Sequence, residues 1–175
     1  MRMWAKQSSR VRGFTIVELL IVIVVIAILA AITIVAYAGI QERAKESQTV
    51  SMLNAYVKGV NLYYRTYGDT LPVANTACFD GTVCWGSVSA TDGATLRTEL
   101  SKVMGTLPEV PSGVAALFVP SSTTSDSVNG GDYTGTYILY QYPDSGSCAT
   151  IGGTRFLNTG ASNGVRTCRA AIELN

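Results

Sequence analysis

A single apolar run dominates the hydrophobic pattern of this 175-residue chain. From Phe14 through Ile40 the only charged residue is Glu18, and no Pro or Gly interrupts the run before Gly39. As a helix, this run would be roughly 40 Å long at 1.5 Å per residue, which is enough to cross a bilayer. The pattern therefore predicts a membrane-length helix with one carboxylate near its start.

The helical pattern continues beyond the apolar run as an amphipathic segment. Residues 41–46 are polar and rich in good helix formers. Apolar residues then recur at spacings of three and four, at Val50, Leu53, Val57, Val60, Tyr64 and Tyr67. Such a stripe predicts a helix face that packs against the rest of the chain. The alternative is that this face packs against another helix in a coiled coil. We expect one helix from about residue 14 to residue 67, ended by Gly68–Asp69.

The rest of the chain is predicted to hold one short helix and several strands. Residues 68–91 have the composition of an irregular loop, and Asp92–Met104 has a helical apolar face with Thr91 or Asp92 as its cap. The strand candidates are residues 114–119, stopped by Pro120, and residues 134–142, 154–157 and 166–174. Residues 121–132 and 158–164 are expected to be loop and turn. The predicted fold class is α+β, with three or four antiparallel strands packed on the long helix.

Charge divides the chain into three parts. Residues 1–13 form a short leader with four basic residues and no acidic ones, which is expected to stay in the cytoplasm by the positive-inside rule. Residues 14–40 would span the membrane, and residues 41–175 would form an extracytoplasmic head. A secretory signal peptide cleaved after Ala36-Tyr37-Ala38 and a plain single-pass anchor are the alternatives. Neither of them explains Glu18.

The composition disfavours catalysis and nucleic-acid binding as the main function. Without the leader, nine Lys and Arg face twelve Asp and Glu, a net charge of −3. Arg155, Arg166 and Arg169 are therefore interpreted as solvated strand positions, and contact with nucleic acid is possible but unsupported. Histidine is absent and the acidic residues are scattered, so no catalytic residue, cofactor or membrane-anchored enzyme is predicted.

The four cysteines all follow the apolar run. Three pairings are possible, and proximity favours Cys78–Cys84 and Cys148–Cys168. Neither pair has the two-to-four-residue spacing of a structural zinc site, so no metal is expected. Disulfides place residues 41–175 outside the cytoplasm, in agreement with the orientation predicted from charge.

The segment Gly13-Phe14-Thr15-Ile16-Val17-Glu18, followed by the apolar run, resembles the type IV pilins and their relatives. That family has a short basic leader ending in Gly, then Phe, a Glu four residues later and about twenty apolar residues. The resemblance implies that a prepilin peptidase cuts between Gly13 and Phe14 and methylates the new Phe14 amine. It also implies that a platform protein and an ATPase assemble the membrane-held subunit into a homo-oligomeric filament, in which Glu18 pairs with the amine of a neighbouring Phe14.

The function implied by the resemblance is a structural subunit of a type IV pilus, serving adhesion, twitching motility or DNA uptake at the cell surface. A pseudopilin of a type II secretion system is the alternative, because residues 63–68 and Leu71-Pro72 are similar to the region after the long helix in major pseudopilins. Cys148–Cys168 resembles the disulfide-bounded loop of many pilins. Val35 and Ala27 replace the proline and glycine of many relatives, so we expect no break in the helix there.

Overall fold

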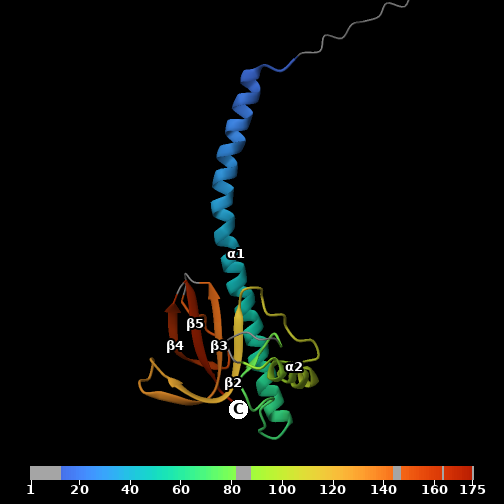
Figure 1. The fold of residues 1–175 in the computed structure, drawn as a ribbon, viewed down its shortest axis with the longest axis vertical. Coiled ribbons are helices and arrows are strands. Elements are labelled where there is room, and N and C mark those ends of the chain that lie inside the picture. The colour runs from blue at the N-terminus through green and yellow to red at the C-terminus, as the bar shows by residue number, and fades with distance from the viewer. Residues whose placement is uncertain (1–12, 82–87, 144–146, 163, 175) are drawn as a thin grey trace, which may run out of the picture. The chain divides into compact units, whose positions relative to one another are not determined.

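The computed structural model describes residues 13–81, 88–143, 147–162 and 164–174. Along the chain these residues form α1 (Ile16–Thr66), β1 (Ala77–Cys78), α2 (Ala90–Met104), β2 (Ala115–Ser125), β3 (Asp132–Pro143), β4 (Thr154–Ser162) and β5 (Val165–Ile172) (Figure 1). The predicted α+β class, with a long N-terminal helix, a short second helix and an antiparallel sheet, is confirmed. The chain divides into two compact units, one ending at Arg43 and the other beginning at Ala44.

The backbone of α1 is helical from Ile16 to Thr66, without a break at Ala27 or Val35. The helix ends where the sequence predicts, because Gly68 and Asp69 both have positive φ, 67° and 60°. The Asp69 N–H donates to the Tyr64 carbonyl at 2.9 Å, which satisfies one of the last carbonyls of the helix.

The second half of α1 buries a face that is rotated relative to the predicted stripe. Leu53, Val57 and Val60 are buried as expected, but Tyr64 is only half-buried and Tyr67 is 43% exposed. Their places in the buried face are taken by Thr49, Met52, Tyr56 and Tyr63. Periodicity alone favoured the wrong tyrosines, because the i, i+3 and i, i+4 spacings fit both sets and only packing distinguishes them.

The hydroxyl groups of the buried tyrosines explain this rotation. Tyr56 Oη lies 2.9 Å from the Pro108 carbonyl and 3.2 Å from a guanidinium nitrogen of Arg97. Tyr63 donates to Glu99 Oε2 at 2.7 Å, a bond that, with burial, raises the pKa of Tyr63 to about 12. A buried tyrosine needs a partner for its hydroxyl group, and residues far along the chain supply it here.

The sheet has five strands in the order β1-β2-β3-β5-β4, all antiparallel, rather than the three or four that we predicted. Alternate residues point to opposite faces, as strand geometry requires. Ile138, Tyr140 and Cys168 face the core shared with α1, whereas Tyr137 and Ala171 belong to a smaller cluster on the other face. The additional strand, β1, has only two residues and lies in a segment predicted as loop.

Two strands extend into segments that were predicted as loop. β2 passes Pro120 and continues to Ser125, with a register shift between Val119 and Ser122. Proline has no N–H to donate, and the shift places it outside the ladder, where its carbonyl accepts the Thr136 hydroxyl at 2.6 Å. β4 likewise continues to Ser162 past a shift at residues 156–158. A β-bulge accommodates residues that would otherwise end a strand, so turn composition misplaced both boundaries.

α2 begins two residues before the predicted start. Ser89 caps it, with its hydroxyl accepting the Thr91 N–H at 3.1 Å, so the prediction of Thr91 or Asp92 as the cap is wrong. Leu96 and Leu100 are fully buried as predicted. Near the start of α2, Gly93 packs against backbone, since an added Cβ would lie 3.0 Å from Gly81 Cα and 3.1 Å from the Cys78 carbonyl oxygen.

We predict that Gly93→Ala destabilises the head by about 1–2 kcal/mol, because overpacking outweighs the gain in helix propensity. The measurement is urea unfolding of the full-length protein in detergent, followed by near-ultraviolet circular dichroism. Gly59→Ala is the control, since the atoms that its Cβ would meet belong to the flexible Met104 side chain. Its effect should be smaller. A Gly93→Ala variant as stable as the wild type would contradict the close packing of α2.

Candidate functional site: an apolar helix with one carboxylate and a fastened head

The start of α1 is closed by a reciprocal pair of hydrogen bonds. The Thr15 N–H donates to Glu18 Oε2 at 2.9 Å, and the Glu18 N–H donates to Thr15 Oγ1 at 3.2 Å. This arrangement is a capping box, which satisfies two N–H groups that have no partner within a helix. The Thr15 hydroxyl also donates to the same carboxylate oxygen at 2.9 Å. The one charged side chain of the apolar run therefore has hydrogen-bond partners within its own first turn.

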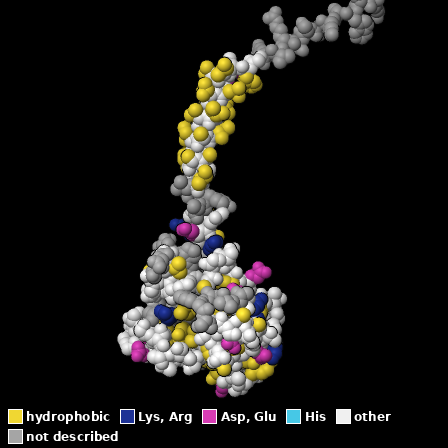
Figure 2. All heavy atoms as spheres, in the orientation of Figure 1, with side chains coloured by type: hydrophobic (Ala, Val, Ile, Leu, Met, Phe, Trp, Pro, Cys, Tyr) yellow, Lys and Arg dark blue, Asp and Glu magenta, His cyan; other side chains and the backbone are white. Residues whose placement is uncertain are grey.

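The side chains behind this cap are apolar and exposed on every side of the helix. Phe14 is 83% exposed, and the large apolar residues from Ile16 to Ile34 are each about half exposed or more. In Figure 2 hydrophobic side chains cover the visible face of this part of α1. By length and composition the helix can cross a membrane. So large an apolar surface requires lipid or other apolar helices around it.

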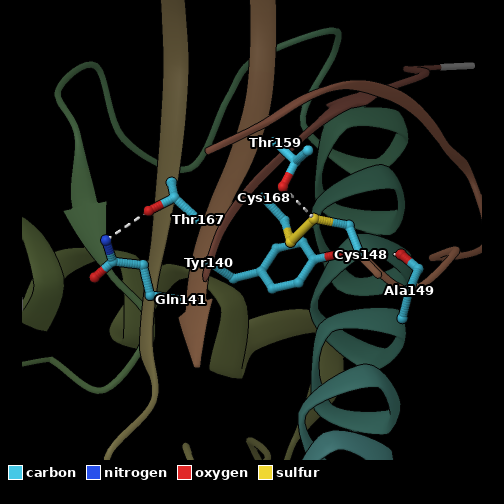
Figure 3. The surroundings of a disulfide bond; sticks show 7 residues. All are labelled: Tyr140, Gln141, Cys148, Ala149, Thr159, Thr167 and Cys168. Carbon is cyan, nitrogen blue, oxygen red and sulfur yellow. Dashed lines mark hydrogen bonds between the residues drawn. A yellow bond between two sulfur atoms is a disulfide. The ribbon is translucent and has the colours of Figure 1, made fainter. Parts of the chain in front are cut away.

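A disulfide joins Cys148 to Cys168, with a Cα–Cα distance of 5.8 Å, as the sequence predicted. It links the segment before β4 to the buried face of β5 (Figure 3). The Tyr140 hydroxyl donates to the Ala149 carbonyl at 3.0 Å, and Thr159 Oγ1 lies 3.3 Å from Cys148 Sγ. These contacts anchor one end of residues 147–153, which we call the strap.

The other end of the strap is anchored on α1. Ile151 is buried in the main core, and the Gly152 N–H donates to Asn54 Oδ1 at 2.6 Å. Gly153 has a φ of 75° and lies against Val57, where a Cβ would approach to 3.3 Å. Glycine is suited to this place because it adopts positive φ without strain and allows close approach of the backbone. The disulfide and the two glycines together hold the strap between the sheet and α1.

The second predicted disulfide is described only in part. Cys78 is fully buried in β1 and is disulfide-bonded. Its predicted partner, Cys84, lies outside the described residues, as does the basic leader before Gly13.

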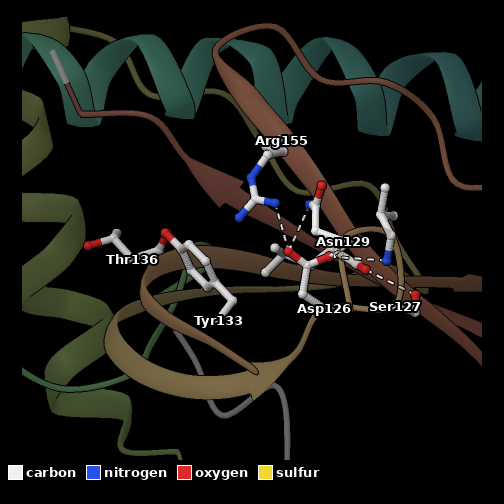
Figure 4. A network of polar contacts seen from close by, with 8 residues as sticks. Asp126, Ser127, Asn129, Tyr133, Thr136 and Arg155 are labelled. Carbon is white, nitrogen blue, oxygen red and sulfur yellow. Dashed lines mark hydrogen bonds and ion pairs between the residues drawn. The ribbon is translucent and has the colours of Figure 1, made fainter. Parts of the chain in front are cut away.

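The tip of the β2–β3 hairpin is tied to β4 by a polar network around Asp126 (Figure 4). Asp126 is buried, and Arg155 donates to its Oδ2 at 2.6 Å. Asn129 donates to the same carboxylate through both its side chain and its N–H, each at 3.0 Å. Ser127 donates its N–H to the Leu157 carbonyl at 3.0 Å. Hydrogen bonds from Asn129 and Arg155 lower the pKa of Asp126 to about 2, although burial opposes this shift.

No pattern in the sequence singles out Asp126, and Arg155 is predicted to be a solvated strand position. Arg155 does lie on β4 with its side chain 40% exposed, and the structure adds an ion pair with Asp126 and a contact over the Tyr133 ring, 5.5 Å from its centroid. The strand register places Arg166 on the face of Cys168 and Arg169 on the face of Ala171, the opposite faces that we predicted. Among the described residues, no group of three His, Cys, Asp or Glu could hold a metal ion.

The N-terminal part of the chain matches a family model, and longer stretches are similar to named proteins. Residues 8–34 match the prokaryotic N-terminal methylation motif. A fimbrial protein of Neisseria meningitidis serogroup A is 27% identical over 119 residues, which cover 68% of this chain and 61% of that protein. A type IV major pilin protein of Neisseria gonorrhoeae is 37% identical over 57 residues, or 33% of this chain and 34% of that protein.

A second fimbrial protein, from Neisseria meningitidis serogroup B, is 26% identical over 119 residues. The chain spans 61% of the length of each meningococcal relative. No solved structure matches it.

We predict that Asp126→Asn removes part of the acid sensitivity of the head. Because the pKa of Asp126 is lower in the folded protein than the ordinary value of about 3.9, its contribution to stability is present above pH 4 and is lost as the pH falls toward 2. The free energy of unfolding, measured in urea from pH 6 to pH 2, should differ less between wild type and variant at pH 2 than at pH 6. Asp132→Asn is the control, because Asp132 is an exposed aspartate at the first position of β3. If the free energy of unfolding of wild type and of Asp126→Asn changed with pH in parallel, Asp126 would not be the source of this acid sensitivity.

We predict that removing the Cys148–Cys168 disulfide by a double substitution to alanine destabilises the head by about 3 kcal/mol, as expected for a loop of this length. Urea unfolding of the full-length protein in detergent measures the change. Reduction of the wild type with dithiothreitol should lower the free energy of unfolding by at least as much, because it also breaks the disulfide of Cys78. An unchanged unfolding midpoint in the double variant would show that the strap is held without the disulfide.

Proposed function

We propose that this chain, which belongs to the type IV pilin family, is a structural subunit of a type IV pilus. The subunit is held in the membrane by the first part of α1 and is then assembled into a filament at the cell surface. The filament would serve adhesion, twitching motility or DNA uptake. The observation that carries the proposal is a helix exposed and apolar on every side, with a single carboxylate in its first turn.

The same apolar surface of α1 is suited to the membrane and to the interior of the filament. In the membrane, lipid surrounds the side chains from Phe14 to Ile34, and Glu18 lies near the end of the span, where it can reach the interface. In the filament, the corresponding helices of other copies take the place of lipid. Transfer between the two settings therefore leaves the apolar side chains in a similar environment, and only the carboxylate experiences a large change.

Glu18 supplies the register of the assembled helices. Buried among apolar helices without a positive partner, its carboxylate would be disfavoured by several kcal/mol. Cleavage between Gly13 and Phe14 creates an amino group at the start of the neighbouring helix, and pairing with it removes this cost. The capping box that Glu18 forms with Thr15 supports the proposal, because it satisfies the carboxylate until such a partner is available. The pair contributes specificity of axial position more than net stability.

Processing and export would precede assembly. The basic leader stays in the cytoplasm, where a prepilin peptidase cuts after Gly13 and methylates the Phe14 amine, and the head faces outward as a single-pass protein. The Cys148–Cys168 bond supports this orientation, since disulfides persist in oxidising compartments. A platform protein and an assembly ATPase would then draw the subunit from the membrane into the growing filament.

We predict that Glu18→Ala leaves the protein in the membrane and processed but lowers surface fibres at least about tenfold, because the neighbouring amine is then buried without a partner. Electron microscopy of the cell surface measures the fibres, and N-terminal mass spectrometry tests processing. The mature protein should begin at Phe14, with a methylated amine. Glu42→Ala is the matched control, since Glu42 is an exposed glutamate of the same helix outside the apolar run.

Normal fibres from Glu18→Ala would rule out the register role. A mature N-terminus after Ala38 would replace the proposal with secretion by a signal peptide. Wild-type cells that process the protein at Phe14 and yet carry no surface fibres would instead indicate a pseudopilin of a type II secretion system.

A further inference from the structure

We infer that the heads of neighbouring copies meet through two different grooves beside α1. The first groove lies between α1 and the strap and contains Lys58, and the second lies between α1 and residues 108–112 and carries Glu109. In the contact, residues 108–111 of one copy enter the first groove of the next. The inference rests on the proposed function, because it concerns how heads join within a filament.

The first groove has a volume of about 480 Å³ and an exposed apolar floor. Leu62 is 48% exposed there, with Lys58 one turn before it on the same face of α1. Gly152, Gly153 and Glu173 line the groove from the other side. The two glycines lie close against α1, since an added Cβ would meet Asn54 Oδ1 at 3.2 Å from Gly152 and Val57 at 3.3 Å from Gly153. A second cation, Arg65, also lines the groove, so two of the three charged residues among its described lining are cations.

The second groove has a volume of about 640 Å³ and is bordered by a rigid segment. Pro108 and Pro111 flank Glu109 and Val110, and each proline fixes its own φ angle. The Tyr56 hydroxyl lies 2.9 Å from the Pro108 carbonyl, and Val110 packs against the main core. Glu109 is exposed on this anchored segment. A segment that is already ordered loses little conformational entropy when it binds a partner.

The two grooves are chemically complementary. Among the described residues that line the second groove, Glu109 is the one charged side chain, whereas Lys58 and Arg65 outnumber Glu173 in the first. Contact would bring the Glu109 carboxylate toward the Lys58 ammonium and cover Leu62 with proline rings. The charge pair selects the partner surface, and burial of Leu62 supplies apolar contact.

The positions of the grooves make the contact directional. They have none of their described lining residues in common, and their α1 residues point in directions about 100° apart at 3.6 residues per turn. A contact between two different patches is heterologous, and such contacts repeat into open chains unless the rotation closes a ring. A filament needs a contact of this kind, whereas a patch that binds its own copy would stop at a dimer.

The test uses charge reversal in the full-length protein. Lys58→Glu and Glu109→Lys, made separately, place like charges together at every contact and should each lower surface fibres at least about tenfold. The double variant restores an opposite pair and should recover most of the wild-type fibre mass. Asp132→Lys is the control, since it reverses an exposed acid that lines neither groove. All variants retain Glu18, and N-terminal mass spectrometry verifies processing.

A second measurement uses wild-type fibres grown from copies with two isotope labels. A carbodiimide joins a lysine amine to a carboxylate only when they are in contact, so a mixed-label peptide joining Lys58 to Glu109 is the expected product. The inference is overturned if wild-type fibres form but the single reversals do not reduce them, if the double variant fails to recover, or if no mixed-label peptide appears. The proposed function survives each of these results. Absence of fibres from the wild type would instead refute the proposed function, and the inference with it.

Discussion

The change in hydrophobic pattern along α1 is the constraint on which the rest of the structure depends. Residues 16–34 are apolar on every side, so no face of the helix is suited to water. Residues 49–63 are apolar on one side only, and this side packs into the main core of the head. A helix can bury only one stripe against a single sheet, which explains why the sheet lies on one side and the opposite side of α1 carries Lys58 and Leu62.

Because α1 covers one face of the sheet, the other face needs separate protection. A small cluster around Tyr137 and Leu157 lies there, and the β2–β3 hairpin reaches β4 through Asp126 and Arg155. The strap covers the edge of the main core, where the disulfide and Asn54 anchor it. Both tethers join residues that are distant in sequence. They stiffen the parts of the head that regular secondary structure leaves less supported.

Glu18 connects the local structure to the proposed assembly. In its own helix the carboxylate completes a capping box, a role that any globular protein can use. What distinguishes it is the apolar run behind it, because in a bundle of such helices the carboxylate would lack water. The capping box has a plain sequence signal, Thr-x-x-Glu ahead of an apolar run, whereas the ion pair of Asp126 with Arg155 has none, since its partners are 29 residues apart.

The sequence by itself determined the long helix, its end at Gly68–Asp69 and the α+β class, and it favoured the Cys148–Cys168 pairing that the structure shows. Each of these follows from local periodicity, from turn residues or from short spacing along the chain. Only the tertiary structure decided which tyrosines of α1 are buried, that β2 passes Pro120, and that Arg155 is paired. Those outcomes depend on partners distant in sequence: the Pro108 carbonyl, the Thr136 hydroxyl and the Asp126 carboxylate. Local pattern carries no information about such partners, because folding brings them together.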